Sequence, residues 1–254
     1  MDNATKRQLK KQDQFVAITS SSVHWADEHR QKTIIAAVIV VVIILASVGG
    51  YTLYQNRSAT AATEFGAAME LYQTPLVNPA QPVPPGMKTF PTAKARAAAA
   101  NTQFQQVASH YNLTSSGKLA EYFVGLTYID EGQNAPAEEA LKKVSTSWDG
   151  DLAALGKSAL AELYQQTGQD AQAIDLYNQL IKGHAATVPP GLAQIQLAEL
   201  YQAEGKTDQA RQIYALLKDK DKDSKGKPGA AAQIATQKLN PTPQAGAGAP
   251  PEAQ

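Results

Sequence analysis

The side chains with the clearest potential for chemistry lie near the N-terminus, where His24 and His29 flank Asp27 and Glu28. Two histidines with a carboxylate between them suggest a zinc site. A zinc-protease helix needs its histidines four residues apart, with a glutamate directly after the first, so that both rings share one helical face. Here the spacing is five, which rotates the second ring off that face. We therefore expect no metal here and interpret the segment as interfacial, with Trp25 at the depth of the lipid headgroups.

Three aspartates near the C-terminus, Asp219, Asp221 and Asp223, resemble the start of a calcium-binding loop. Such a loop requires glycine at its sixth position and glutamate at its twelfth, where this chain has Ser224 and Ala230. The lysines between the aspartates also oppose a cation. The segment is therefore predicted to be a solvated linker.

The sequence contains no glycine-rich phosphate loop, nucleophile elbow, zinc-protease helix or dinucleotide fingerprint. It has no cysteine, which excludes disulfides, thiolate metal sites and a cysteine nucleophile. Its 23 lysines and arginines balance 23 aspartates and glutamates, so no net charge attracts it to nucleic acid. We expect no enzymatic activity, no cofactor, no metal and no small-molecule substrate.

A membrane-spanning helix is the sharpest local prediction. Residues 34–53 contain no charge, and twelve of the twenty are Ile, Val or Leu. A helix of this length spans about 30 Å, the thickness of the hydrocarbon core of a bilayer. Tyr51 and Tyr54 fall where interfacial aromatic residues are common. We assign the span to residues 33–55.

The flanking charges predict the orientation of this span. Residues 1–32 carry six lysines and arginines, whereas the twenty or so residues after the span carry Arg57 alone. The positive-inside rule then makes residues 1–32 a cytoplasmic leader and exports the rest of the chain. A cleaved signal peptide is the alternative, because residues 46–48 offer small side chains near a cleavage point. The length of the leader and of the apolar run favours an uncleaved anchor.

The rest of the chain repeats itself every 36 or 37 residues. One triplet of residues recurs four times: Ala100, Phe104, Val107; Ala137, Leu141, Val144; Ala173, Tyr177, Leu180; and Ala210, Tyr214, Leu217. A second triplet recurs in step with it: Gly125, Tyr128, Gly132; Ala161, Tyr164, Gly168; and Ala198, Tyr201, Gly205. Two sets that keep one register indicate a structural repeat.

A pair of helices explains both triplets. A small residue lets a neighbouring backbone approach, and the tyrosine three positions later lies on the same face. The glycine four residues further on ends the helix in the left-handed conformation. The second helix presents its alanine and its large apolar residue at i and i+4. Each pair buries only part of its apolar surface, so three or more must stack.

The stretch from Ala161 to Tyr177, AELYQQTGQDAQAIDLY, resembles a tetratricopeptide repeat, and residues 198–214 repeat it. The period is two or three residues longer than usual, which places the extra length in loops at 112–117, 145–151 and 183–190. The resemblance implies an all-α fold: a single N-terminal transmembrane helix followed by a tetratricopeptide-repeat solenoid over residues 59–239. Residues 59–72 would be the first helix of the first pair, and residues 92–110 the second.

Four segments complete the predicted domain organisation. A proline-rich insertion, residues 73–91, cannot be helical and is either a contact element or disordered. A charged linker, residues 218–227, precedes a capping helix at residues 229–239. Residues 240–254 form a disordered tail rich in Pro, Ala and Gly.

The whole layout resembles the YfgM-type ancillary subunit of the bacterial Sec translocon. The likeness rests on the leader ending in residues 25–30, the immediate anchor, the helix at 59–72 and the closing helix at 230–239. It implies a periplasm-facing scaffold in the bacterial inner membrane. Its partners would be proteins: translocon subunits, periplasmic chaperones or emerging chains.

In repeats of this type the first helices line a concave groove. By this resemblance, six residues would face a partner protein: Ser158, Glu162, Gln165, Ile195, Glu199 and Gln202. Simple exposure to solvent is the alternative for each. Two other functions also remain open: a scaffold that coordinates cell-envelope assembly or cell division, and a structural homo-oligomer.

Overall fold

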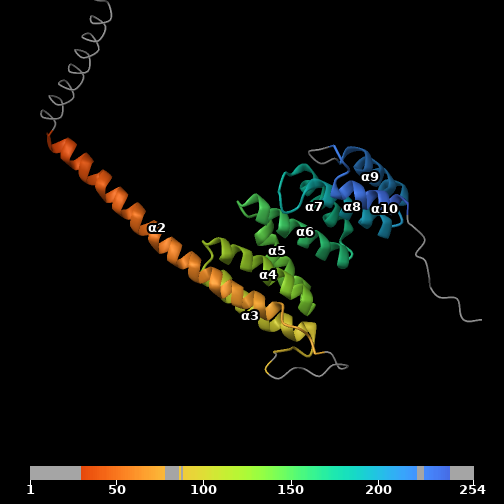
Figure 1. Ribbon diagram of the computed structural model, residues 1–254, viewed down its shortest axis with the longest axis horizontal. Coiled ribbons are helices and arrows are strands. Elements are labelled where there is room, and N and C mark those ends of the chain that lie inside the picture. The colour runs from red at the N-terminus through yellow and green to blue at the C-terminus, as the bar shows by residue number, and fades with distance from the viewer. Residues whose placement is uncertain (1–29, 78–85, 87, 222–225, 241–254) are drawn as a thin grey trace, which may run out of the picture. The chain divides into compact units, whose positions relative to one another are not determined.

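The computed structural model describes residues 30–77, 86, 88–221 and 226–240 (Figure 1). Several sequence predictions therefore lie outside the described residues. They concern the leader up to residue 29, including the segment from His24 to His29, the centre of the proline-rich insertion (78–85 and 87), residues 222–225 of the charged linker, and the tail from residue 241.

The described part of the chain consists of helices joined by turns and loops, as the all-α prediction requires, and Leu76 forms an isolated parallel bridge with Phe90. It divides into two compact units, with the boundary between Arg57 and Ser58. Its helices are α2 (Arg30–Tyr72), α3 (Ala93–His110), α4 (Ser115–Glu131), α5 (Asn134–Ser145), α6 (Gly150–Gln166), α7 (Asp170–Lys182), α8 (Pro190–Ala203), α9 (Thr207–Lys220) and α10 (Ala230–Leu239). Each helix from α3 to α10 contacts the next one along the chain.

The apolar part of α2 is long and apolar enough to cross a membrane, as a single-pass anchor or a signal sequence. Its large apolar residues from 34 to 53 are all at least half exposed. Its polar side chains return their hydrogen bonds to the same helix: Ser47 donates to the carbonyl of Ile43 (2.7 Å) and Thr52 to that of Gly49 (2.9 Å). These hydroxyls therefore need no partner from water.

Helix α2 is one continuous helix where the sequence predicted two separate helices. The predicted helix at residues 59–72 is the C-terminal continuation of the apolar helix, without a break between Tyr54 and Ala59. The intervening residues, Gln55 to Ser58, contain neither proline nor glycine, so nothing local ends the helix. The chain thus passes from the apolar segment into the repeat unit as continuous helix.

The last turns of α2 lie beside α3 (Figure 1). They pack on α3 and α4 through an aromatic cluster. The rings of Phe104 and Phe123 are stacked with centroids 5.1 Å apart, and Phe65 lies 5.6 Å from each. The hydroxyl of Tyr72 donates to Asp130 Oδ2 (2.8 Å). Burial, helped by this carboxylate, raises the pKa of Tyr72 to about 12. This cluster holds the first helix pair together.

The first repeated triplet forms the core of the second helices. Its four alanines, Ala100, Ala137, Ala173 and Ala210, are all 0% exposed. The large residues four positions later are at most 1% exposed, and the third members at most 4%: Phe104, Leu141, Tyr177, Tyr214, Val107, Val144, Leu180 and Leu217. The repeat positions predicted from the sequence are therefore the positions that pack in the core.

The predicted left-handed glycines are confirmed. Gly132, Gly168 and Gly205 have φ values of 75°, 71° and 76°. After each glycine the next backbone N–H donates to the carbonyl of the repeat tyrosine, at 2.7–2.8 Å. This bond from the residue after glycine back into the last turn is the helix-ending motif that glycine favours. It turns the chain from the first helix of each pair into the second.

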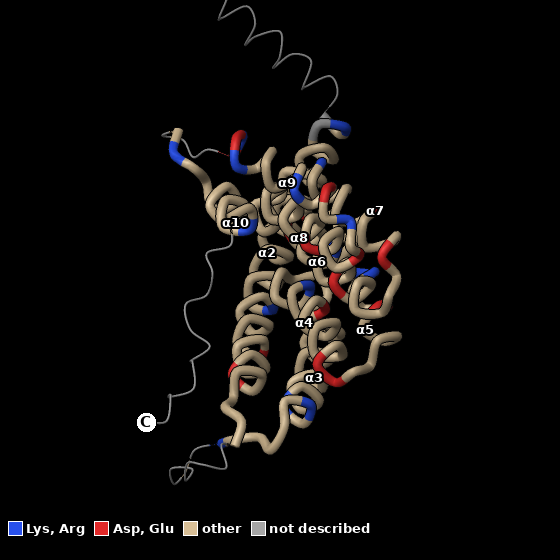
Figure 2. The backbone as a smooth tube through the Cα atoms, turned by 90° about the vertical axis from the view of Figure 1, so that its right-hand side faces the viewer, with Lys and Arg blue, Asp and Glu red and all other residues tan. Residues whose placement is uncertain are grey.

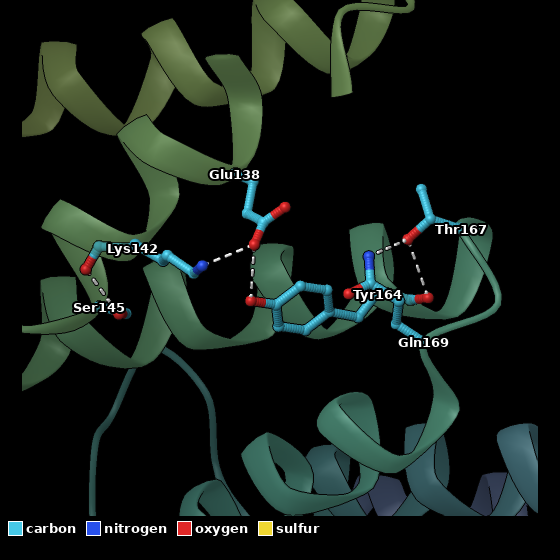
Figure 3. A network of polar contacts seen from close by, with 6 residues as sticks. All are labelled: Glu138, Lys142, Ser145, Tyr164, Thr167 and Gln169. Carbon is cyan, nitrogen blue, oxygen red and sulfur yellow. Dashed lines mark hydrogen bonds and ion pairs between the residues drawn. The ribbon is translucent and has the colours of Figure 1, made fainter. Parts of the chain in front are cut away.

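The repeat tyrosine makes a polar contact at two junctions between repeats, and Figure 3 shows the one at Tyr164. Tyr164 on α6 donates its hydroxyl proton to Glu138 Oε1 on α5 (3.1 Å), and Lys142 donates to the same oxygen (2.6 Å). The bond from Lys142 holds the pKa of the Glu138 carboxyl below its usual range. One period upstream, Gln105 of α3 donates to the hydroxyl of Tyr128 on α4 (2.8 Å). Each contact joins the second helix of one repeat to the first helix of the next.

Close packing between α5 and α6 depends on Gly156. A β-carbon at this position would lie 2.7 Å from the backbone nitrogen of Ser145, which is too close for any real contact. At Gly125 the neighbour is a side chain, because a β-carbon there would lie 2.6 Å from Leu141 Cδ2. The sequence had suggested an approaching backbone at Gly125. The space is instead filled by the large residue of the next helix.

Gly156→Ala should destabilise the fold by about 1–3 kcal/mol, because the added methyl group collides with backbone that cannot move freely. Gly150→Ala is the matched control: it changes a glycine of the same helix whose β-carbon would meet nothing within 4 Å. This control should be neutral or stabilising by up to about 1 kcal/mol. Thermal unfolding followed by circular dichroism measures both. Equal stability of the two variants would contradict a close approach at Gly156.

Candidate partner-binding surface

The first helices of successive pairs, α4, α6 and α8, present one connected set of residues, which we call the first-helix face. It comprises Tyr122, Leu126 and Ile129 on α4, Ser158, Glu162 and Gln165 on α6, and Gln196, Glu199 and Gln202 on α8. Helix α4 contacts α6 directly, and α8 contacts α10. The face is therefore built from residues about 80 positions apart in the sequence.

A glutamine joins α6 to α8 within this face. Gln196 donates from Nε2 to Glu162 Oε1 (2.9 Å) and accepts from the hydroxyl of Ser158 at 3.4 Å. Ser158 and Gln165 are half-buried, whereas Glu162 is exposed. The structure thus brings the predicted residues of α6 together with α8. The bridging residue itself was not among those predicted.

The predicted residues of α8 divide into two kinds. Glu199 and Gln202 belong to the face: Glu199 forms an ion pair with Lys238 of α10 (2.7 Å), and Gln202 accepts from Tyr214 (3.3 Å). The prediction for Ile195 was wrong. Its side chain is only 4% exposed and packs in the core with Ala231 and the other alanines of α10. Helix α10 covers the place where a partner would have met it.

Sequence reasoning missed the residues of α4. Tyr122, Leu126 and Ile129 stand 36 positions before Ser158, Glu162 and Gln165, and all three are half-buried beside the central core. Subtracting one period from the predicted residues would have found them. Their apolar character means that the face changes along the stack, from apolar on α4 to polar and acidic on α6 and α8.

The carboxyl of Glu162 lies between two repeats and is partly withdrawn from water. Partial burial raises its pKa, although the bond from Gln196 acts in the opposite direction. Burial also raises the pKa of Tyr122, with the Glu162 charge adding to the effect. Burial likewise raises the pKa of Tyr177, and the charges of Glu162 and Glu199 add to the effect. The glutamate is therefore a charge held near two aromatic hydroxyls, although much of its side chain remains exposed.

The face carries groups that are suited to recognising protein. Among the described residues, no three His, Asp or Glu side chains gather closely enough to hold a metal ion. A hollow of about 470 Å³ lies elsewhere, between the start of α6 and the end of α7. Acidic and basic residues alternate along the repeat unit instead of gathering by sign (Figure 2). Apolar, amide and single carboxylate groups suit a peptide or protein surface.

Stacked helix pairs with a fixed period, glycine-ended first helices and one continuous first-helix face define a helical-repeat protein of the interaction type. Comparison with known families agrees. The family model of the tetratricopeptide repeat-like domain matches residues 24–240, and the chain belongs to this family. No curated protein and no solved structure matches the chain. The family is one of protein-binding scaffolds, and the comparison identifies no catalytic family.

Glu162→Gln should stabilise the chain near neutral pH and lose this advantage in acid. A carboxyl whose pKa is raised by folding binds its proton more tightly in the folded state. That contribution is complete below the unfolded pKa and is lost as the pH rises through the folded pKa. Near neutral pH the folded chain must hold a charged carboxylate in a partly buried position, which costs free energy. Glutamine has no charge and avoids this cost. Exposure screens the charge, so we expect a gain of about 1–2 °C in melting temperature near pH 7.

Melting temperatures at neutral pH and below about pH 4 measure the effect, since the carboxyl of an ordinary glutamate titrates near the lower of these pH values. Glu139→Gln on the exposed side of α5 controls for the loss of one negative charge. A gain from Glu162→Gln that is the same at both pH values would show that the carboxyl is not withdrawn from water.

Proposed function

We propose that the protein is a membrane-anchored scaffold whose repeat domain faces the periplasm and binds proteins at or near the Sec translocon. The first-helix face is its binding surface. The observation that carries this proposal is the continuity of that face, since Gln196 joins α6 to α8 through Ser158 and Glu162. A partner in extended or helical form would contact several repeats at once, which is how repeat proteins obtain large interfaces.

Three observations support an uncleaved anchor. The family match begins at residue 24, before the apolar segment, so the family domain includes that segment. The helix continues from the apolar segment into the first repeat without interruption. Its Ser and Thr side chains are bonded within the helix, as a lipid environment requires. The charge bias across the segment favours a cytoplasmic leader and an exported repeat domain.

The composition of the face supports a protein ligand of mixed character. Tyr122, Leu126 and Ile129 offer apolar contacts, while Glu162 and Glu199 offer carboxylates. Chains that emerge from a translocon, and the chaperones that receive them, present apolar segments next to basic and polar ones. The link to the translocon itself rests on the resemblance of the leader, anchor and repeat layout to the YfgM-type ancillary subunit.

Crosslinking in intact cells should locate the partner on the first-helix face. A photo-crosslinking residue at Glu162 or Gln165 should yield adducts with translocon subunits or periplasmic chaperones. The same residue at Glu139 or Asp175, exposed positions on the second helices α5 and α7, is the matched control. We expect several-fold fewer adducts from the control, because these positions are outside the proposed interface.

Mass spectrometry of the adducts separates the alternatives. Adducts with division or envelope-assembly proteins from Glu162 and Gln165 would keep the binding surface and replace the translocon assignment. Adducts with the chain itself alone would favour a homo-oligomer. Equal adducts from first and second helices would contradict the first-helix face as the binding surface.

The orientation can be measured cleanly because the chain contains no cysteine. A single cysteine introduced by Gln169→Cys, at an exposed turn of the repeat unit, should react with a membrane-impermeant maleimide in intact spheroplasts. A single cysteine introduced by Asn3→Cys should react only after lysis. The reverse pattern would contradict the orientation, and a mature chain that lacks the leader would show a cleaved signal peptide.

A further inference from the structure

Exposed apolar side chains lie on two of the loops between repeats. They belong to Leu113, which follows α3, and Trp148, which precedes α6; they are 76% and 85% exposed. Lys118 of α4 stacks its ammonium on the Trp148 ring, 4.2 Å from the centroid. We call these three residues the loop patch. Few large apolar side chains in the repeat unit are so exposed, and none of the contacts described above needs them.

The two loops of the patch border one hollow of about 140 Å³. Asn112 and Ser147 line it from the two loops, and Val144 and Leu152 contribute apolar side chains. The loops are also the place where this chain exceeds the usual length of its repeat. Leu113 and Trp148 therefore belong to two loops that border the same hollow.

Lys118 is the half-buried cation of the patch. Lys118 has no carboxylate partner among the described residues. The neighbouring acids are engaged: Glu121 pairs with Lys143 (2.8 Å), and Asp149 accepts from the first backbone N–H groups of α6. A tryptophan and a leucine next to an unpaired lysine are the side chains that prefer the interface of a bilayer.

The connectivity of the chain keeps this patch near the lipid. The hydroxyl of Tyr111, two residues before Leu113, donates to Glu64 Oε1 (2.8 Å). Glu64 follows the end of the predicted span at residue 55 by nine residues. Nine residues reach at most about 30 Å even when fully extended, and about 14 Å as a helix. Glu64 is therefore tethered within that distance of the end of the predicted span, and the loop that carries Leu113 lies farther by the length of the Glu64 and Tyr111 side chains and two residues.

We propose that the loop patch docks on the surface of the bilayer that holds the anchor, with Trp148 and Leu113 at the headgroup–acyl boundary and Lys118 beside lipid phosphates. This inference rests on the anchor of the proposed function. Docking would hold the loops that carry Leu113 and Trp148 against the lipid. A lipid surface is chosen over a protein because the tether supplies it at a high effective concentration.

Tryptophan quenching in liposomes tests the proposal on the full chain. Trp25→Phe leaves Trp148 as the single tryptophan. The chain is reconstituted into vesicles of phosphatidylethanolamine and phosphatidylglycerol, with or without lipids brominated near the top of the acyl chain. We expect the brominated lipids to remove roughly half of the emission, since interfacial side chains sit 5–10 Å deep, within reach of such quenchers. When Leu113→Gln is added to this variant, the brominated lipids should quench the emission of Trp148 measurably less.

The matched control carries Trp25→Phe, Trp148→Phe and Gln169→Trp, which moves the single tryptophan to an exposed turn that ends a first helix. Its emission should be unchanged by brominated lipids. Circular dichroism of each variant verifies the fold. A chain that is incorporated, with Trp148 no more quenched than the control, would overturn the inference and leave the anchor intact.

Three other outcomes would also overturn the docking proposal. A chain that fails to enter the vesicles would overturn both the anchor and the docking. Emission of Trp148 that shifts to the blue with protein concentration, without quenching by lipid, would assign the patch to a second copy of the chain. Protection of Trp148 only after a protein partner is added would assign it to that partner.

Discussion

The structure depends on four fully buried alanines, Ala100, Ala137, Ala173 and Ala210, which let each second helix pack closely against its neighbours. A larger residue at any of them would separate the layers that Phe104, Leu141 and their equivalents fill. Because a single pair cannot bury both of its faces, each pair is stable only against the next. The apolar face at each end of the stack must therefore be covered by another element. The last turns of α2 cover one end through an aromatic cluster, and the alanine face of α10 covers the other.

The sequence predicted the repeat core well because its signals are local. Alanine followed by a large residue at i+4, and tyrosine followed by glycine, are fixed by the geometry of one helix and its end. Gly168 is an example: its left-handed φ of 71° follows from its place four residues after Tyr164. The period then transfers each assignment to every repeat. Applied more fully, it would also have found Tyr122 on the first-helix face.

The remaining features depend on contacts that no local pattern encodes. Ile195 occupies a position that faces outward in the repeat pattern, yet α10 returns across it and pairs Lys238 with Glu199. A β-carbon at Gly191 would lie 2.8 Å from the Ala231 side chain, so this glycine permits the close approach of α10. The role of Gln196 likewise follows from the spacing between α6 and α8. Such contacts join segments that are far apart in the sequence, and only the folded chain displays them.

The central claim is that the first-helix face binds protein, and amide hydrogen exchange tests it most directly. The exchange of the anchored chain would be measured alone and in complex with the protein that crosslinks to it. Binding on this face predicts slower exchange along α4, α6 and α8, with the second helices α5, α7 and α9 little changed. Slower exchange confined to the second helices, or to the loops between repeats, would contradict the claim.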